Sequence, residues 1–110
     1  MATITEDYCS KEIYRLLIEK GFDGEVHTTF DDEGYTQPSI TLQMAMKWLR
    51  EVHNIFIEIG TSIDLNGKYH FSYTILDKEC KYVRSGYTSF DWNYEDAIEE
   101  AIKYCLENLI

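Results

Sequence analysis

Histidines and cysteines are the side chains of this sequence best suited to bind a metal ion, and their spacing indicates no metal site. The three histidines, His27, His53 and His70, form no HxxxH pair, and the three cysteines form no CxxC pair. Zinc ligands are typically paired at such spacings. We interpret His53 as a cation-capable group that meets the last carbonyls of a helix. The sequence therefore predicts neither a metal nor another cofactor.

A cluster of acidic residues in the first third of the chain is a candidate for calcium binding. Several carboxylates that converge on one point can bind this hard cation. The spacing of the cluster does not match an EF-hand loop, and we interpret it as the solvated tip of a hairpin; whether residues 31–33 also bind a cation stays open. The acids of this cluster are Asp23, Glu25, Asp31, Asp32 and Glu33.

Nucleophilic catalysis would need a cysteine with a base beside it. Cys9 and Cys105 fall on apolar helix faces, where we expect inert thiols in the core. Cys80 could approach His70 across two neighbouring strands, but no third group is placed to orient the pair. Without a phosphate-binding loop or a metal motif either, we expect that the protein is not an enzyme.

The charge balance limits the partners. The chain has 20 Asp and Glu residues and 10 Lys and Arg residues, so its net charge is -10. This negative charge opposes binding to nucleic acid and to anionic membranes. The first residues carry acids where a signal peptide would be basic, and the longest apolar run is far too short to span a bilayer. We expect a cytoplasmic protein with reduced thiols.

The length of 110 residues predicts a single domain. Apolar residues recur with helical spacing over residues 6–20, with Thr5 as a candidate N-cap and Gly21 as the stop. Residues 25–37 follow as a short strand, a tight acidic turn and a second short strand, and Pro38 separates them from what comes next.

Two further helices are expected. One starts at Ser39 or Thr41 and ends near His53, and its apolar arc is so wide that it predicts cover by a sheet on one side and by the first helix on the other. The last helix is capped by Asn93, with Asp96 three residues on, and it runs to the end of the chain with a buried stripe that includes Leu109.

Three strands lie between these two helices. Residues 55–63 alternate apolar and polar positions, Asn66-Gly67 predicts a two-residue type I′ turn, and residues 69–75 return. A second turn at Asp77 leads into a third strand over residues 80–88. The fold class is therefore α+β, with a three-stranded antiparallel meander covered on one face by helices. From Thr41 onward, the α-β-β-β-α order is that of a double-stranded-RNA-binding-like fold.

Two stretches carry a resemblance at the level of sequence. Residues 41–54 (TLQMAMKWLREVHN) and 94–110 (YEDAIEEAIKYCLENLI) resemble a family of small uncharacterised proteins encoded by phages and prophages of gut bacteria, and residues 8–22 are similar to that family as well. The likeness is weakest over residues 23–39. It implies a setting in a bacterial host cell, and it implies no reaction and no catalytic residues.

Two hypotheses of function follow. The first is an accessory phage or prophage protein that acts by binding another protein, a second copy of itself included. The second is an acidic decoy that mimics nucleic acid and occupies a basic site of a host protein. For the first, we expect the partner surface on the sheet face opposite Ile57, Ile59, Phe71 and Tyr73. The candidate surface residues are Phe56, Glu58, His70, Ser72, Thr74, Tyr82 and Arg84.

Overall fold

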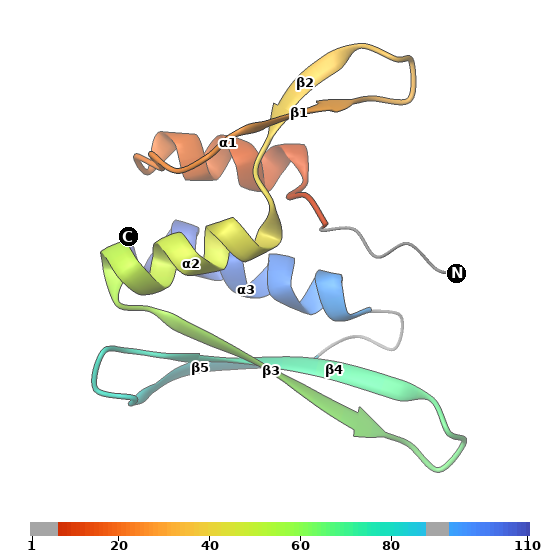
Figure 1. The fold of residues 1–110 in the computed structure, drawn as a ribbon. Helices are drawn as coiled ribbons and strands as arrows, with labels where there is room; N and C mark the ends of the chain where they lie inside the picture. The colour runs from red at the N-terminus through yellow and green to blue at the C-terminus, as the bar shows by residue number, and fades with distance from the viewer. Residues whose placement is uncertain (1–6, 88–92) are drawn as a thin grey trace.

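The computed structural model describes residues 7–87 and 93–110 and shows an α+β fold with a two-stranded and a three-stranded antiparallel sheet. Its elements in chain order are α1 (Lys11–Glu19), β1 (His27–Phe30), β2 (Thr36–Ser39), α2 (Leu42–His53), β3 (Phe56–Ile63), β4 (Tyr69–Leu76), β5 (Tyr82–Tyr87) and α3 (Tyr94–Asn108). Figure 1 shows α2 and α3 packed on one face of the sheet β3-β4-β5, with α1 and the hairpin β1–β2 beyond these helices.

The helix α1 begins later than the sequence predicts, because the residues before it pair with another segment. The backbone N–H of Cys9 donates to the carbonyl of Ile40 at 2.8 Å, which keeps Cys9 extended rather than helical. Ser10 then caps the helix, since its hydroxyl accepts from the N–H of Ile13. The predicted cap Thr5 lies outside the described residues. Cys9 is buried as expected, but not on a helix face.

The helices α2 and α3 confirm the predicted caps. The hydroxyl of Thr41 accepts from the N–H of Met44, and Asn93 and Asp96 form a reciprocal capping box. The first helix was predicted to cover one side of α2, but α1 packs mainly against α3. It is Phe22, just after α1, that reaches α2, with its ring edge-to-face on Trp48.

The ends of the helices are more exposed than their apolar stripes indicate. Val52 lies in the last turn of α2, Leu109 follows the last turn of α3, and both are exposed. The core is formed further from the ends, between the sheet and α2 and α3 and between α1 and α3. Its most completely buried side chains are Leu17, Ile40, Leu49, Ile75, Ile98, Ile102, Cys105 and Leu106.

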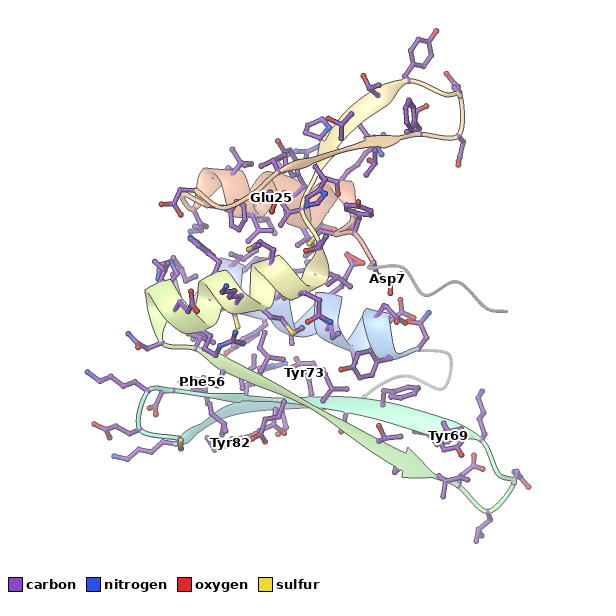
Figure 2. The ribbon with its side chains drawn as sticks, in the orientation of Figure 1. Asp7, Glu25, Phe56, Tyr69, Tyr73 and Tyr82 are labelled. Atoms are coloured by element: carbon purple, nitrogen blue, oxygen red, sulfur yellow. The ribbon has the colours of Figure 1, made fainter. Side chains whose placement is uncertain are left out.

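The three-stranded sheet confirms the predicted meander and the predicted covered face. Ile57 and Ile59 on β3 are half-buried against the helices, and Tyr73 at the centre of β4 is only 3% exposed. Figure 2 shows Tyr73 between the sheet and the helices. Its ring lies over Gly86 of β5, where a Cβ would come within 2.1 Å of it. The α-β-β-β-α order from α2 onward is observed, while the likeness to double-stranded-RNA-binding domains stays a prediction.

The three hairpins use the same turn. Each begins with an aspartate, Asp31, Asp64 or Asp77, whose carboxylate accepts from the backbone N–H groups two and four residues later at 2.8–3.0 Å. The residue three positions on has a positive φ in every case, and these residues are Gly34, Gly67 and Cys80. A type I turn followed by a left-handed residue has this pattern.

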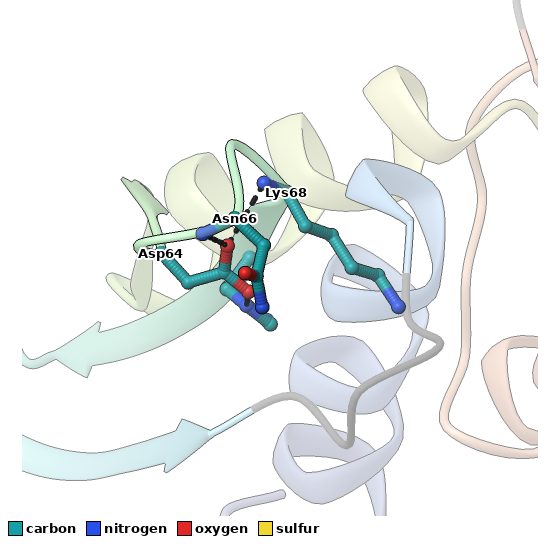
Figure 3. A network of polar contacts seen from close by, with 4 residues as sticks. Asp64, Asn66 and Lys68 are labelled. Atoms are coloured by element: carbon teal, nitrogen blue, oxygen red, sulfur yellow. Dashed lines mark hydrogen bonds and ion pairs between the residues drawn. The ribbon is translucent and has the colours of Figure 1, made fainter.

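The type I′ turn predicted at Asn66-Gly67 is therefore wrong. That turn needs a positive φ at both residues, and of the two only Gly67 has one. The loop instead has three residues and closes between Asp64 and Lys68, where the N–H of Asp64 donates to the carbonyl of Lys68 at 2.9 Å. Figure 3 shows the Asp64 carboxylate that holds this turn.

The hairpin β1–β2 is shifted relative to the predicted residues 25–37: its first strand begins at His27 and its second strand ends at Ser39. Pro38 does not end the second strand but lies inside it, opposite Thr28. In a two-stranded sheet both strands are edges, so a residue without an N–H can be accommodated on the side that faces away from the partner strand.

Candidate functional site

The candidate site is the face of the sheet β3-β4-β5 that points away from the helices. The strand register fixes which side chains share this face, because successive residues alternate between the two sides. Among the described residues, the helices lie on the other side of the sheet (Figure 1). Six of the seven predicted surface residues share this open face: Phe56, Glu58, His70, Ser72, Thr74 and Tyr82.

An apolar row crosses one end of the open face. Phe56, Leu76 and Tyr82 are direct cross-strand partners on the three strands. Tyr82 is 67% exposed, and Phe56 and Leu76 are half-buried. Leu76 was not among the predicted residues. The alternation along β4 nevertheless places it on the same face as Thr74, opposite to the face of Tyr73 and Ile75. A row of this kind, with a phenol at its end, has the composition of a protein-binding surface.

The centre of the open face is made of small side chains. Thr74 and Ser85 are cross-strand partners whose hydroxyl oxygens are 3.2 Å apart, with Glu58 on the other side of Thr74. Ser72 lies opposite Gly60, and its Oγ is 2.8 Å from the place a Cβ on Gly60 would take. This part of the face is therefore low and flat.

A hydrogen-bonded pair of a histidine and an aspartate lies at the far end of the open face. The Nε2 of His70 is 2.9 Å from the Oδ2 of Asp64, the aspartate of the β3–β4 turn (Figure 3). The side-chain hydrogen bond with His70, followed by the one from the N–H of Lys68, lowers the pKa of Asp64. His70 is thus part of the support of a turn.

The placement of Arg84 on the open face is wrong. The register shifts between Ile75 and Leu76, so that Val83 is an extra residue in β5 and Arg84 lies opposite Ile75 on the helix side. There its guanidinium carbon is 4.5 Å from the centre of the Tyr104 ring. Without Arg84, the open face does not combine this cation with Glu58 as the sequence predicts.

The thiols are not arranged for nucleophilic catalysis. Burial raises the pKa of Cys9 and of Cys105 to about 12, so both stay protonated at neutral pH. Cys80 is exposed in the β4–β5 turn, whereas His70 lies near the other end of β4. Six strand residues separate them by roughly 20 Å, at about 3.3 Å per residue. The predicted approach of Cys80 to His70 is therefore wrong.

The remaining histidine and acid predictions have separate outcomes. His53 packs edge-to-face on Trp48 at 4.6 Å between ring centres, and its buried Nε2 has no hydrogen-bond partner in the described part of the chain. This nitrogen therefore does not meet the last carbonyls of α2, although His53 lies in the last turn of that helix as predicted. Within the acidic cluster, Asp31 uses its carboxylate to hold the turn. The residues described contain no group of three or more side chains that could hold a metal ion.

Comparisons with other proteins do not assign the chain to a family. The chain matches no family model, and it has no significant match among curated proteins or solved structures. None of the helices in the described ranges combines the length and the apolar run needed to cross a bilayer.

Proposed function

We propose that the protein is a non-enzymatic interaction module that binds another protein through the open face of the sheet β3-β4-β5. The observation that supports this proposal most directly is the apolar row Phe56-Leu76-Tyr82 beside a flat centre of hydroxyl groups and Gly60. Aromatic side chains on a flat surface with few charges suit contact with a second protein surface. In keeping with the resemblance, we place this function in an accessory phage or prophage protein in the cytoplasm of a bacterial host.

Duplex nucleic acid is not among the partners that we propose. The N-terminus of α3 could approach phosphates in a domain of this element order. Its first turn carries Glu95 and Asp96 instead of lysines, and Asp96 is held in the capping box. These charges repel phosphate, in agreement with the net charge of -10.

The alternative of an acidic decoy has less support in the geometry of α3. Glu99 accepts a hydrogen bond from the N–H of Ser10 at 2.9 Å, and Lys103 is 3.1 Å from Glu12. Both side chains therefore join α3 to α1 and do not form part of a free row of carboxylates. A protein-binding sheet face gives the exposed ring of Tyr82 a role in binding, and the decoy hypothesis does not use this ring.

A binding experiment with matched variants tests the proposal. The tagged wild type, the face variant Ser72→Arg with Thr74→Glu, and the control Thr28→Arg with Thr36→Glu on exposed positions of β1–β2 are incubated with bacterial lysate. We expect a protein that the wild type and the control retain and the face variant loses, with a Kd at least about tenfold weaker for the purified pair. Equal retention by all three variants, or none by the wild type at micromolar concentration, contradicts the proposal.

A further inference from the structure

We propose that β3 pairs antiparallel with β3 of a second copy, so that two sheets join into one continuous sheet across a two-fold axis. This inference concerns the edge of the sheet and is independent of what binds its open face. It rests on the backbone groups of β3 that point away from β4, on the contrast with the other edge, and on the side chains that the pairing brings together.

The backbone of β3 has a complete set of outward hydrogen-bonding groups. The N–H of Asp64 donates to Lys68 at the closing turn, and hydrogen-bonded positions recur at every second residue of an antiparallel pair. The even-numbered residues of β3 therefore bond to β4, and the odd-numbered ones point their N–H and C=O groups away from the sheet. These outward residues are Ile57, Ile59, Thr61 and Ile63, and β3 is the edge of the sheet formed by the described residues.

The opposite edge, β5, is protected against such pairing. Val83 forms a bulge, and the hydroxyl of Tyr82 accepts from the outward N–H of Ser85 at 3.0 Å. Bulges, occupied N–H groups and charges are how sheet edges avoid association. β3 has no register shift over its eight residues, and the stretch from Ile59 to Ile63 contains no charge and no proline. The edge open to a partner is therefore β3.

The four outward residues of β3 define one symmetric register. They are centred on Gly60, so a two-fold axis at Gly60 places Ile57 opposite Ile63 of the second copy and Ile59 opposite its Thr61. Each of these pairs exchanges both backbone hydrogen bonds, and no outward group between Ile57 and Ile63 is left over. Gly60 meets its own copy at a non-hydrogen-bonded position, where the Cα atoms approach to about 4.5 Å. A glycine leaves this closest approach free of side chains.

The side chains on the helix side complement each other in this register. Ile63 is 59% exposed at the tip of the hairpin, and Ile57 borders a surface groove of about 410 Å³ between α2 and β3. The pairing brings Ile63 of the second copy beside Ile57 and Met46 in this groove. This complementarity favours a second copy over an unrelated strand.

The mass in solution tests the pairing, by size-exclusion chromatography with light scattering over a range of concentrations. We expect the wild type at twice the monomer mass, and Thr61→Pro, which removes one outward N–H without touching the β4 ladder, at the monomer mass with an unchanged circular dichroism spectrum. The open-face variant Ser72→Arg with Thr74→Glu serves as the control and stays a dimer. A monomeric wild type at high concentration, or a dimer lost only in the control, overturns the proposal.

A cross-linking variant tests the register without a proline in the strand. Glu58 and Ser62 of the second copy are expected as directly opposite, non-hydrogen-bonded neighbours, close enough for a disulfide after a small adjustment. Glu58→Cys with Ser62→Cys, made in a Cys80→Ser background because Cys80 is an exposed thiol, should form a covalent dimer on mild oxidation. The variants with only one of these two cysteines should give a yield of covalent dimer at least about tenfold lower than the double variant. Equal yields from the single and double variants contradict this register.

Discussion

The two faces of the sheet β3-β4-β5 are built from different side chains for different contacts. On the helix side, Tyr73 fills the space over Gly86 and is almost completely buried. On the open side, Ser72 occupies the corresponding place over Gly60, and its neighbours Thr74 and Ser85 carry hydroxyl groups. The side chains on the helix side are constrained in size and shape, because they must fill the space between the sheet and the helices α2 and α3. On the open side, none of the helices in the described part of the chain packs against the strands, so its side chains are not constrained in this way.

The largest effect should come from the core above the helix side. Leu49 of α2 has no exposed surface, and Leu49→Ala should lower the free energy of unfolding by about 2–5 kcal/mol through the cavity that it leaves. Val52→Ala, on the same helix but 55% exposed, is the matched control and should change it by less than about 0.5 kcal/mol. Urea denaturation measures both. Equal effects would mean that this helix face is not buried.

A pair of glycine substitutions compares the two faces directly. Gly86→Ala would place a Cβ within 2.1 Å of the buried Tyr73 ring, so we expect a loss of about 1–3 kcal/mol from overpacking. Gly60→Ala meets only the Oγ of Ser72, 2.8 Å away, and this small side chain can rotate. The loss there should be below about 0.5 kcal/mol. Thermal melts that rank the two substitutions the other way would contradict the assignment of the faces.

Polar changes on the open face should leave stability nearly unaltered. Ser72→Arg with Thr74→Glu adds two large side chains where the described residues provide no covering layer, and we expect a change within about 0.5 kcal/mol in unfolding free energy. The corresponding variant on the helix side, Ile57→Arg with Ile59→Glu, should not fold. If the open-face variant is also unfolded, the open face is part of a packed layer.

The smallest effect should be a pH dependence at the edge of the open face. Hydrogen bonds from His70 and Lys68 lower the pKa of Asp64 below its ordinary 3.8, so the folded state binds the proton less tightly than the unfolded chain does. The contribution is complete above the unfolded pKa and is lost as the pH falls through the folded pKa. The difference in melting temperature between wild type and Asp64→Asn should therefore shrink as the pH falls below about 4.

The elements predicted correctly are those specified by nearby residues. The helices α2 and α3 follow from apolar periodicity and from the caps Thr41 and Asn93, and the two faces of β3 and β4 follow from strict alternation. The β3–β4 turn was located correctly, but its type depends on Asp64, two residues before the Asn-Gly pair. A turn motif of two residues does not contain this information.

The errors arise where a distant contact overrides the local pattern. Cys9 fits the periodicity of α1, but it pairs with Ile40 and stays extended. Arg84 fits the alternation of β5, and the extra residue Val83 moves it to the helix side, where it contacts Tyr104. Six of the seven candidate surface residues were placed correctly because alternation without a bulge is sufficient for them. A bulge depends on the partner strand, so one sequence does not reveal it.

The shared turn of the three hairpins has a consequence for the order of folding. Each turn is closed by an aspartate and by groups at most four residues away, so it can form before any distant contact exists, and hairpins of this kind form in about 1–10 μs. The meander β3-β4-β5 can therefore assemble from local contacts, while α3, which follows β5 in sequence, must still dock on it. We expect a transition state in which β4 is structured and α3 is not, with high φ-values at Ile75 and low ones at Ile102.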